Sequence, residues 1–354
     1  MTSSTSVASN GHAASNGVAL APRNAGTSSI EDAIVAMKAG KFVVVMDNED
    51  RENEGDLIMA AEFATEAAVA FMLRHTTGII CVPALAPRIN ELQLPLMVEN
   101  NTEVHKCKFT VTVDLREGNS TGVSAADRAR TIRALADPKV QAQAFNRPGH
   151  IFPLLAMDGG VLMNDDNGRM MRRPQLEEFA IKYDLPLITI SDLIRYRVRT
   201  ETLVTRRSNK DASVSSVVVT PHGQFKAFEY ASVVSASQSY EVLVYGDVAQ
   251  QTDVPVYFVE EGFVQSVNAQ WAQQHVVKHG AGILIYVNDS KKLLEISGEL
   301  MARQSIFGMG MQIARDLQIA SVVLLSTDEK VAFDPQGFGV SVTGFERLAI
   351  PSSQ

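Results

Sequence analysis

The sequence has few cysteines and no long apolar run, and each scarcity excludes a class of protein. Two cysteines among 354 residues, Cys81 and Cys107, are too few for a disulfide framework and are typical of a reducing compartment. No apolar run approaches the roughly 20 residues that a membrane-spanning helix needs. We therefore expect a soluble, cytoplasmic protein.

Positively charged residues are fewer than negatively charged ones, with 32 Lys and Arg against 40 Asp and Glu. The formal net charge of −8 argues against a general surface for nucleic acid or anionic membrane, so neither is an expected partner. Apolar content of 45% and charged content of 20% are ordinary for a globular protein that buries a core. The length suits two domains.

The first 27 residues lack both acids and an apolar block. They are rich in Ser, Ala, Asn and Gly, with Arg23 as the one Lys or Arg residue. This composition does not match a secretory signal, so residues 1–27 are predicted to be a disordered tail.

Residues 28–199 alternate between helical and strand patterns. Ser28 and Glu31 have the spacing of a capping box, and a helix follows from Ile30 to about Gly40. Expected strands are 41–47, 57–61, 79–83, 108–115 and 186–190, with an apolar segment at 151–156. Expected helices are 65–75, 86–92, 124–135, 174–184 and one that begins at Ser191. The alternation predicts an α/β or α+β layered domain.

The last part of the chain has a different character. Residues 200–215 are polar and are predicted to be a linker. Expected strands beyond it are 216–220, 224–230, 240–246, 255–259, 282–287 and 320–325, and expected helices are 265–278 and 308–316. Residues 216–354 therefore form a second expected α/β domain.

An acidic segment directly follows the first expected strand. Residues 47–56, "DNEDRENEGD", contain six carboxylates and one cation, Arg51. Such a cluster repels itself unless a cation or hydrogen bonds offset the charge. A solvated charge run is one interpretation, but a loop confined between two strands also suits Mg²⁺, which prefers oxygen ligands. Arg51 then suits a phosphate or hydroxyl group of a substrate.

Several motifs, in order, resemble those of 3,4-dihydroxy-2-butanone 4-phosphate synthase, an enzyme of riboflavin biosynthesis. They are "DNEDRENEGD" (47–56), "RHTTGIICVP" (74–83), "STGVSAADRARTI" (120–132), "RPGHIFPLLAMDGGVL" (147–162) and "NDDNGRMMRRPQLEEFA" (164–180). The resemblance implies a mixed-sheet domain over 28–199. It also implies a lyase that converts D-ribulose 5-phosphate to the four-carbon phosphate and formate. Mg²⁺, or Mn²⁺ in its place, and a homodimer with the active site at its interface are implied as well.

The resemblance assigns roles to four residues. Glu52 matches the family's metal-ligating glutamate, beside the substrate-contacting Arg51. Asp56 matches an aspartate that contacts the hydroxyls of the substrate, and His150 matches a catalytic histidine. From the residues alone, His150 is better interpreted as a structural histidine that bonds its neighbours, and for His75 and His105 we keep that interpretation. Cys81 is expected to be a packed small residue near the pocket. The "TGVSAADRAR" stretch is either a phosphate-binding helix start or a capped surface helix.

One departure from the family pattern concerns the centre of the domain. The family follows its "GGVL" block with an R-G-G-H-T-E-like motif, a helix and a strand bearing a glutamate. Here Leu162 and Met163 run directly into "NDDNG" (164–168), so a second metal-ligating histidine, a phosphate-binding arginine and threonine, and a catalytic glutamate are missing. Asp165 and Asp166 are the nearest substitutes. The loss also predicts a hole in the apolar core, where single truncations cost about 2–5 kcal/mol.

The second domain resembles GTP cyclohydrolase II at "TPHGQFKAFEY" (220–230) and at residues 307–342. That enzyme holds Zn²⁺ with three cysteine thiolates, but both cysteines of this chain lie in the first domain. We therefore expect a degenerate domain with neither zinc nor cyclohydrolase activity. His275 and His279, spaced i,i+4, are expected to be a surface pair.

Three interpretations of the whole chain follow. It is an active synthase with an inert second domain, a non-catalytic regulatory or binding protein of the riboflavin pathway, or the product of an incomplete coding sequence. We adopt the synthase as the prediction.

Overall fold

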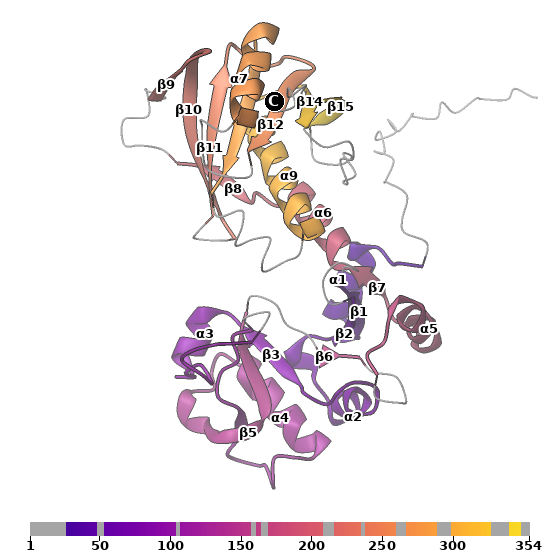
Figure 1. Ribbon diagram of the computed structural model, residues 1–354. Coiled ribbons are helices and arrows are strands. Elements are labelled where there is room, and N and C mark those ends of the chain that lie inside the picture. The colour runs from indigo at the N-terminus through magenta and orange to yellow at the C-terminus, as the bar shows by residue number, and fades with distance from the viewer. Residues whose placement is uncertain are drawn as a thin grey trace, which may run out of the picture.

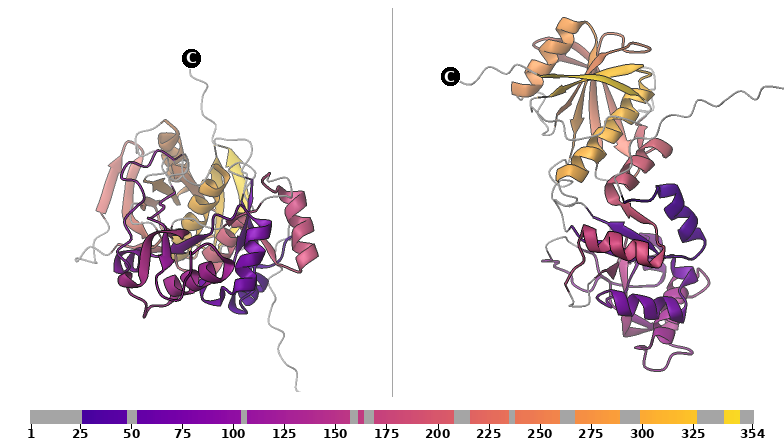
Figure 2. Two further views of the ribbon diagram at one scale, coloured as in Figure 1. Left: turned by 90° about the horizontal axis from the view of Figure 1, so that it is seen from below. Right: turned by 90° about the vertical axis from the view of Figure 1, so that its right-hand side faces the viewer.

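A computed structural model describes residues 26–47, 53–103, 107–156, 161–163, 169–207, 216–234, 238–259, 267–288, 299–326 and 340–347. Most of the predicted tail lies outside these ranges. The chain forms two lobes, and helix α6 (Ile190–Thr200) lies at their junction (Figures 1 and 2). None of the helices in the described part of the chain has the length and apolar character needed to cross a membrane.

The first lobe contains two small mixed sheets with helices packed around them. One sheet has the order β6-β2-β1-β7, and the other has the order β3-β5-β4. The strands are β1 (Val43–Met46), β2 (Gly55–Ile58), β3 (Cys81–Ala84), β4 (Val113–Leu115), β5 (Phe145–Leu155), β6 (Val161–Leu162) and β7 (Leu187–Thr189). The helices before α6 are α1 (Ile30–Lys38), α2 (Glu66–His75), α3 (Ala86–Glu91), α4 (Ala125–Ala136) and α5 (Arg173–Tyr183).

The second lobe is a single large mixed sheet between helices. Its order is β15-β14-β12-β13-β11-β10-β8, and β9 also pairs with β10. The strands are β8 (Val204–Arg206), β9 (Ser216–Thr220), β10 (Gly223–Ser232), β11 (Ser239–Tyr245), β12 (Val254–Val259), β13 (Gly282–Val287), β14 (Ser321–Ser326) and β15 (Ser341–Arg347). Helix α7 (Val267–His279) covers one face, and α9 (Glu299–Asp316) covers the other (Figure 2).

The predicted mixed α/β architecture is confirmed, but the structure corrects several local predictions. The first helix is capped by Ser29 and Asp32, because Ser28 pairs through its backbone with Leu187. β8 pairs with β10, so part of the predicted linker 200–215 belongs to the second sheet. β5 begins before the apolar segment at 151–156, and α9 begins before residue 308. β15 was not predicted.

Candidate functional site

The acidic segment is the turn of the β1–β2 hairpin. Met46 pairs with Gly55 and Val45 pairs with Asp56, while the Asp47 amide donates to the Glu54 carbonyl at 2.9 Å. The strand before the turn is fixed by its apolar side chains, because three of the four residues of β1 are buried. Arg51 and Glu52, two of the predicted site residues, lie outside the described residues.

The described part of the hairpin offers oxygen ligands. Because side chains alternate along a strand, the side chains of Asp47, Glu54 and Asp56 are placed on one face of the hairpin. The Oδ1 atoms of Asp47, Asn53 and Asp56 are buried. Among the described residues, none donates a hydrogen bond to the Asn53 Oδ1. Such oxygens fit a hard divalent cation. Within the described ranges, no three His, Cys, Asp or Glu side chains are close enough to hold a metal without further ligands.

His150 forms a close pair with Asp114, a residue for which we predicted no role. The His150 Nδ1 lies 2.7 Å from Asp114 Oδ2, and the His150 amide donates to Asp114 Oδ1 at 3.0 Å. An ionised carboxylate only accepts, so Nδ1 carries the proton and Nε2 remains available for proton transfer. The His150 side chain is 40% exposed, whereas that of Asp114 is 12% exposed. The available sequence signal was that Asp114 is the single carboxylate within the predicted strand 108–115.

The loop before α4 closes over this pair. Gly122 has a φ of +82°, and a Cβ there would lie 2.0 Å from Asp114 Oδ2 and 2.8 Å from His150 Nδ1. The loop is held by Asp127, which accepts hydrogen bonds from the Ser120 hydroxyl at 2.7 Å and from the Gly122 amide at 3.1 Å. Ser124 caps α4 through the Asp127 amide. The "STGVSAAD" stretch therefore packs against the His150–Asp114 pair.

Cys81 connects the two parts of the site. It pairs with Phe152 in β5, two residues after His150 and on the same strand face. Burial, followed by the nearby Asp56 carboxylate, raises the pKa of the Cys81 thiol to about 11. The thiol is therefore protonated at neutral pH and is a poor nucleophile. This agrees with the prediction of a packed residue. The effect of Asp56 on the Cys81 thiol also links the hairpin to β3, the strand that pairs with the His150 strand β5.

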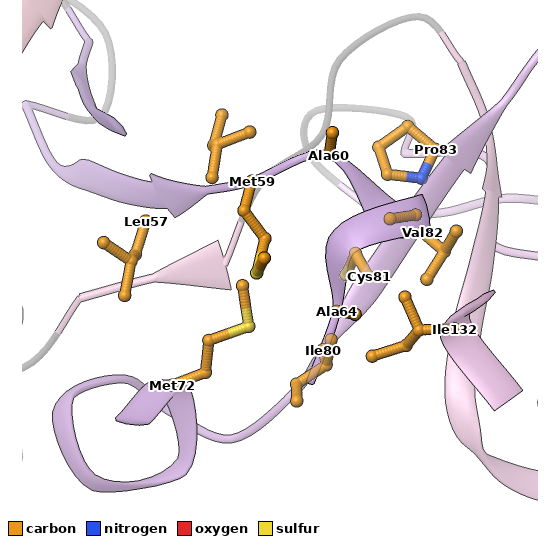
Figure 3. A pocket seen from close by; sticks show the side chains of 12 residues that line it. Leu57, Met59, Ala60, Ala64, Met72, Ile80, Cys81, Val82, Pro83 and Ile132 are labelled. Atoms are coloured by element: carbon orange, nitrogen blue, oxygen red, sulfur yellow. The ribbon is translucent and has the colours of Figure 1, made fainter. Parts of the chain in front are cut away.

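An apolar cavity of about 270 Å³ lies beside Cys81. Its lining comes from β2, α2, β3 and α4, and the side chains of Met59 and Met72 point toward each other across it (Figure 3). Leu57 in this lining pairs with Val161 of β6, the strand that ends at the missing segment. The cavity therefore borders the part of the core in which a hole was expected.

The residues just before the predicted gap form a short strand that is hydrogen-bonded to the β1–β2 hairpin. β6 contains two residues, and the Met163 amide then donates to the Gly55 carbonyl at 2.8 Å. Met163 is fully buried and bridges to Thr76 of the "RHTTG" motif. Asp165 and Asp166, the suggested substitutes, lie outside the described residues.

Three other histidines, His75, His275 and His279, have side-chain contacts outside the candidate site. His75 packs between Phe71 and Phe179, with ring centroids 4.5 and 5.4 Å away. His275 Nε2 lies 3.5 Å from Glu346, whereas His279 Nδ1 lies 3.2 Å from the Ala281 carbonyl. His275 and His279 thus have separate contacts on the second lobe. His105 lies outside the described residues.

Comparison with known proteins places the chain in a family. The sequence model of 3,4-dihydroxy-2-butanone 4-phosphate synthase matches residues 31–164. Riboflavin biosynthesis protein RibBA of Chlamydia trachomatis is 33% identical over 93% of this chain and 89% of its own length. The monofunctional riboflavin biosynthesis protein RIBA 2 of Arabidopsis thaliana, a chloroplastic protein, is 34% identical over 90% of this chain and 76% of its own.

A solved structure agrees along both lobes. RibBX of A. baumannii, a two-domain 3,4-dihydroxy-2-butanone 4-phosphate synthase, superposes with a TM-score of 0.75 at 27% identity. It covers 90% of this chain and 99% of the RibBX chain.

The comparisons also bear on the missing segment. The match to the Chlamydia protein extends over 390 positions, more than the 354 residues present here, so that relative contains segments without a counterpart in this chain. The family match ends at residue 164, beside the predicted gap. The Chlamydia and Arabidopsis proteins are named as riboflavin biosynthesis proteins and RibBX as a synthase, which favours the catalytic interpretation over the non-catalytic one. The chain therefore belongs to the riboflavin biosynthesis family in which a 3,4-dihydroxy-2-butanone 4-phosphate synthase domain, a lyase, precedes a GTP cyclohydrolase II-like domain.

Proposed function

We propose that the acidic hairpin and the His150–Asp114 pair together form the synthase active site. The family reaction converts D-ribulose 5-phosphate to 3,4-dihydroxy-2-butanone 4-phosphate and formate, which requires repeated proton transfers. The observation that carries the proposal is the 2.7 Å contact between His150 Nδ1 and Asp114, because it leaves the exposed imidazole with one nitrogen free to exchange protons.

Each proposed site residue has a role that matches the chemistry of its side chain. His150 Nε2 accepts and returns protons, while Asp114 keeps the imidazole in one tautomer and orientation. Arg51 binds the phosphate or a hydroxyl, and Asp56 accepts hydrogen bonds from substrate hydroxyls. Glu52 is the proposed ligand for Mg²⁺, or for Mn²⁺ in its place, and the described part of the hairpin offers the further oxygens of Asp47, Asn53 and Asp56. When bound, the divalent cation polarises the carbonyl and adjacent hydroxyls of the substrate.

The remaining assignments concern the whole chain. We assign residues 28–199 to the synthase domain and residues 216–354 to a structural or regulatory domain that lacks the zinc thiolates and does not hydrolyse GTP. A homodimer is proposed, together with a cytoplasmic location and no nucleic-acid or membrane partner. Residues 216–354 contain no cysteine, which supports a second domain that holds no zinc thiolate site and does not hydrolyse GTP.

A titration with Mg²⁺ and a ribulose-phosphate ligand tests the hairpin as the binding site. We expect calorimetric binding by the wild-type chain that Glu52→Gln abolishes, because the amide loses the ligand charge. Arg51→Ala is expected to weaken the sugar phosphate more than the metal. Glu62→Gln, on an exposed position of the same lobe, is the control and should titrate like wild type. Identical titrations for wild type and Glu52→Gln would leave the hairpin a solvated charge run.

A further inference from the structure

The exit of the acidic hairpin turn is held by a helix from another part of the chain. Helix α5 begins at Arg173, and Arg172 is its N-cap residue. The Arg172 Nη1 donates to the Asn53 carbonyl at 2.7 Å, and its Nη2 lies 3.6 Å from Glu54 Oε1. One guanidinium thus contacts the backbone of one turn residue and the carboxylate of the next.

The backbone at this exit has an unusual conformation. Asn53 has a φ of +52°, in the left-handed region that residues other than glycine rarely adopt. Asparagine tolerates this region better than most residues, and a contact from outside the turn favours it further over the alternatives. Arg172 supplies such a contact at the Asn53 carbonyl itself.

The first turn of α5, which begins directly after Arg172, is fixed by packing and by a hydrogen bond. Leu176, one helical turn further along α5, is fully buried, and a Cβ at Gly55 would lie 2.5 Å from its methyl groups. The Arg172 amide donates to the Gln175 side chain at 3.0 Å, which fixes the first turn of the helix. The start of α5 and the end of the turn therefore lie in direct van der Waals contact, so the guanidinium reaches Asn53 from a defined position.

The positive charge of Arg172 also affects the acidic segment 47–56. The segment 47–56 contains six carboxylates and a single cation of its own. A second cation lowers their mutual repulsion, although it also repels a metal ion. The Arg172 side chain is 49% exposed, so solvent weakens this repulsion, whereas the hydrogen bond to the Asn53 carbonyl is short and directional. The positioning effect should therefore dominate.

We propose that Arg172 is a positioning residue for the proposed metal site, since it fixes Asn53 and Glu54 and thereby holds the Glu54 carboxylate on the same hairpin face as the Asp56 carboxylate. The proposal rests on the function proposed above for the acidic hairpin. It adds a residue beyond those that the family motifs assigned, and it gives α5 a direct role in the site.

The adjacent Arg173 provides a matched control. Arg173→Ala removes the same charge from the same helix start, but Arg173 is paired within α5, with its Nε 2.9 Å from Glu177 Oε1. Two measurements compare Arg172→Ala with Arg173→Ala. One is calorimetric titration with Mg²⁺ alone. The other is limited trypsin digestion, with the peptide bond after Arg51 followed by mass spectrometry as a direct report on the turn.

Arg172→Ala is expected to weaken Mg²⁺ binding by about 10–100-fold, the usual effect of losing a residue that orients metal ligands. It should also speed cleavage after Arg51, because Asn53 and Glu54, on the carboxyl side of that bond, lose their contact with α5. Arg173→Ala should match wild type in both measurements. Arg172→Lys should lie between wild type and Arg172→Ala, since an ammonium group can still donate to the Asn53 carbonyl.

Three results would overturn the proposal: unchanged cleavage after Arg51 in Arg172→Ala, equal effects of the two alanine variants, or tighter Mg²⁺ binding by Arg172→Ala. If Arg172→Ala does not fold, Arg172→Lys is compared with Arg173→Lys, and equal behaviour of that pair counts against the proposal. A wild-type chain that binds no Mg²⁺ contradicts the proposed metal site instead, while the trypsin comparison still tests Arg172.

Discussion

Asp114 orients His150 through both of its carboxylate oxygens, one on the ring and one on the backbone amide. Asp114→Asn keeps the shape but replaces one acceptor with an NH₂ donor, which disfavours the tautomer with Nδ1 protonated. We expect formate release from ribulose 5-phosphate to fall about 10²-fold or more, the usual range for loss of acid–base assistance. The pH dependence of turnover should shift as well.

The control for this change is Asp137→Asn, an exposed position whose side chain contacts the Lys139 amide. Wild-type turnover and an unshifted pH profile in Asp114→Asn would mean that His150 does not depend on Asp114.

Asp127 makes a second residue-scale prediction, about stability in acid. The Ser120 hydroxyl and the backbone amides of Ser120 and Gly122 donate to its carboxylate and lower its pKa to about 2, from an ordinary value of 3.8. A carboxyl whose pKa is lowered in the folded state stabilises the fold above about pH 4. That stabilisation is lost as the pH falls from about 4 to about 2.

Urea unfolding of wild type and Asp127→Asn at several pH values measures this effect. The wild-type midpoint should exceed that of Asp127→Asn at neutral pH, and the difference should shrink between about pH 4 and about pH 2. A difference that stays constant across this window would show that the charge of Asp127 contributes nothing.

At the scale of single elements, α6 belongs to the cores of both lobes. Leu193 and Tyr196 pack with α1, whereas Ile194 and Val198 pack with the core between α9 and the second sheet. The N-cap of α6, Thr189, pairs with Met46 immediately before the acidic turn. The junction between the lobes is thus a packed helix that reaches to the base of the site.

Gln312 of α9 joins this helix to the second lobe. Its side chain is 2% exposed, donates to the carbonyls of Val198 and Glu201 at 2.8 and 2.9 Å, and accepts from the Leu203 amide at 2.8 Å. Gln312→Ala leaves these backbone groups without that partner, and each buried unsatisfied group costs about 1–3 kcal/mol.

We expect Gln312→Ala to lower the free energy of unfolding by about 2–4 kcal/mol in urea titrations. Gln270→Ala, on the exposed side of α7, is the control and should change it by less than about 0.5 kcal/mol. A Gln312→Ala value as small as the control's would mean that water satisfies the junction equally well.

At the scale of the whole molecule, we expect the missing segment to limit catalysis. In the site proposed above, the hairpin carboxylates form one wall, and the family resemblance implies that the opposite wall comes from the segment absent after Leu162. Without that histidine and glutamate, we expect turnover on ribulose 5-phosphate with Mg²⁺ to be at least about 10²-fold slower than that of an intact homologue.

Insertion of the homologous segment between Leu162 and Met163 should restore formate release. The control insertion carries alanine in place of the segment's histidine and glutamate, so it fills the same space without the chemistry. Near-normal turnover by the unmodified chain would mean that other groups, such as Asp165 or Asp166, have replaced the missing ones. Equal rescue by both insertions would assign the defect to packing.

Sequence periodicity and motif order were sufficient for much of this protein. The alternation of strand and helix patterns indicated two α/β domains, and the cysteine count excluded a zinc-thiolate site in the second one. Strongly patterned elements such as α2 and β13 appeared close to their predicted bounds, because apolar spacing directly reflects which face is buried.

Only the tertiary structure decided the contacts between distant segments. The Asp114–His150 pair, the closure of Gly122 over it and the reach of Arg172 to Asn53 each join residues that are not neighbours in the chain. The choice of Ser29 over Ser28 as the helix cap followed from backbone pairing with Leu187, and β8 and β15 became strands through partners in the second sheet. Local propensity carries no information about such partners, since they depend on where the folded chain brings each segment.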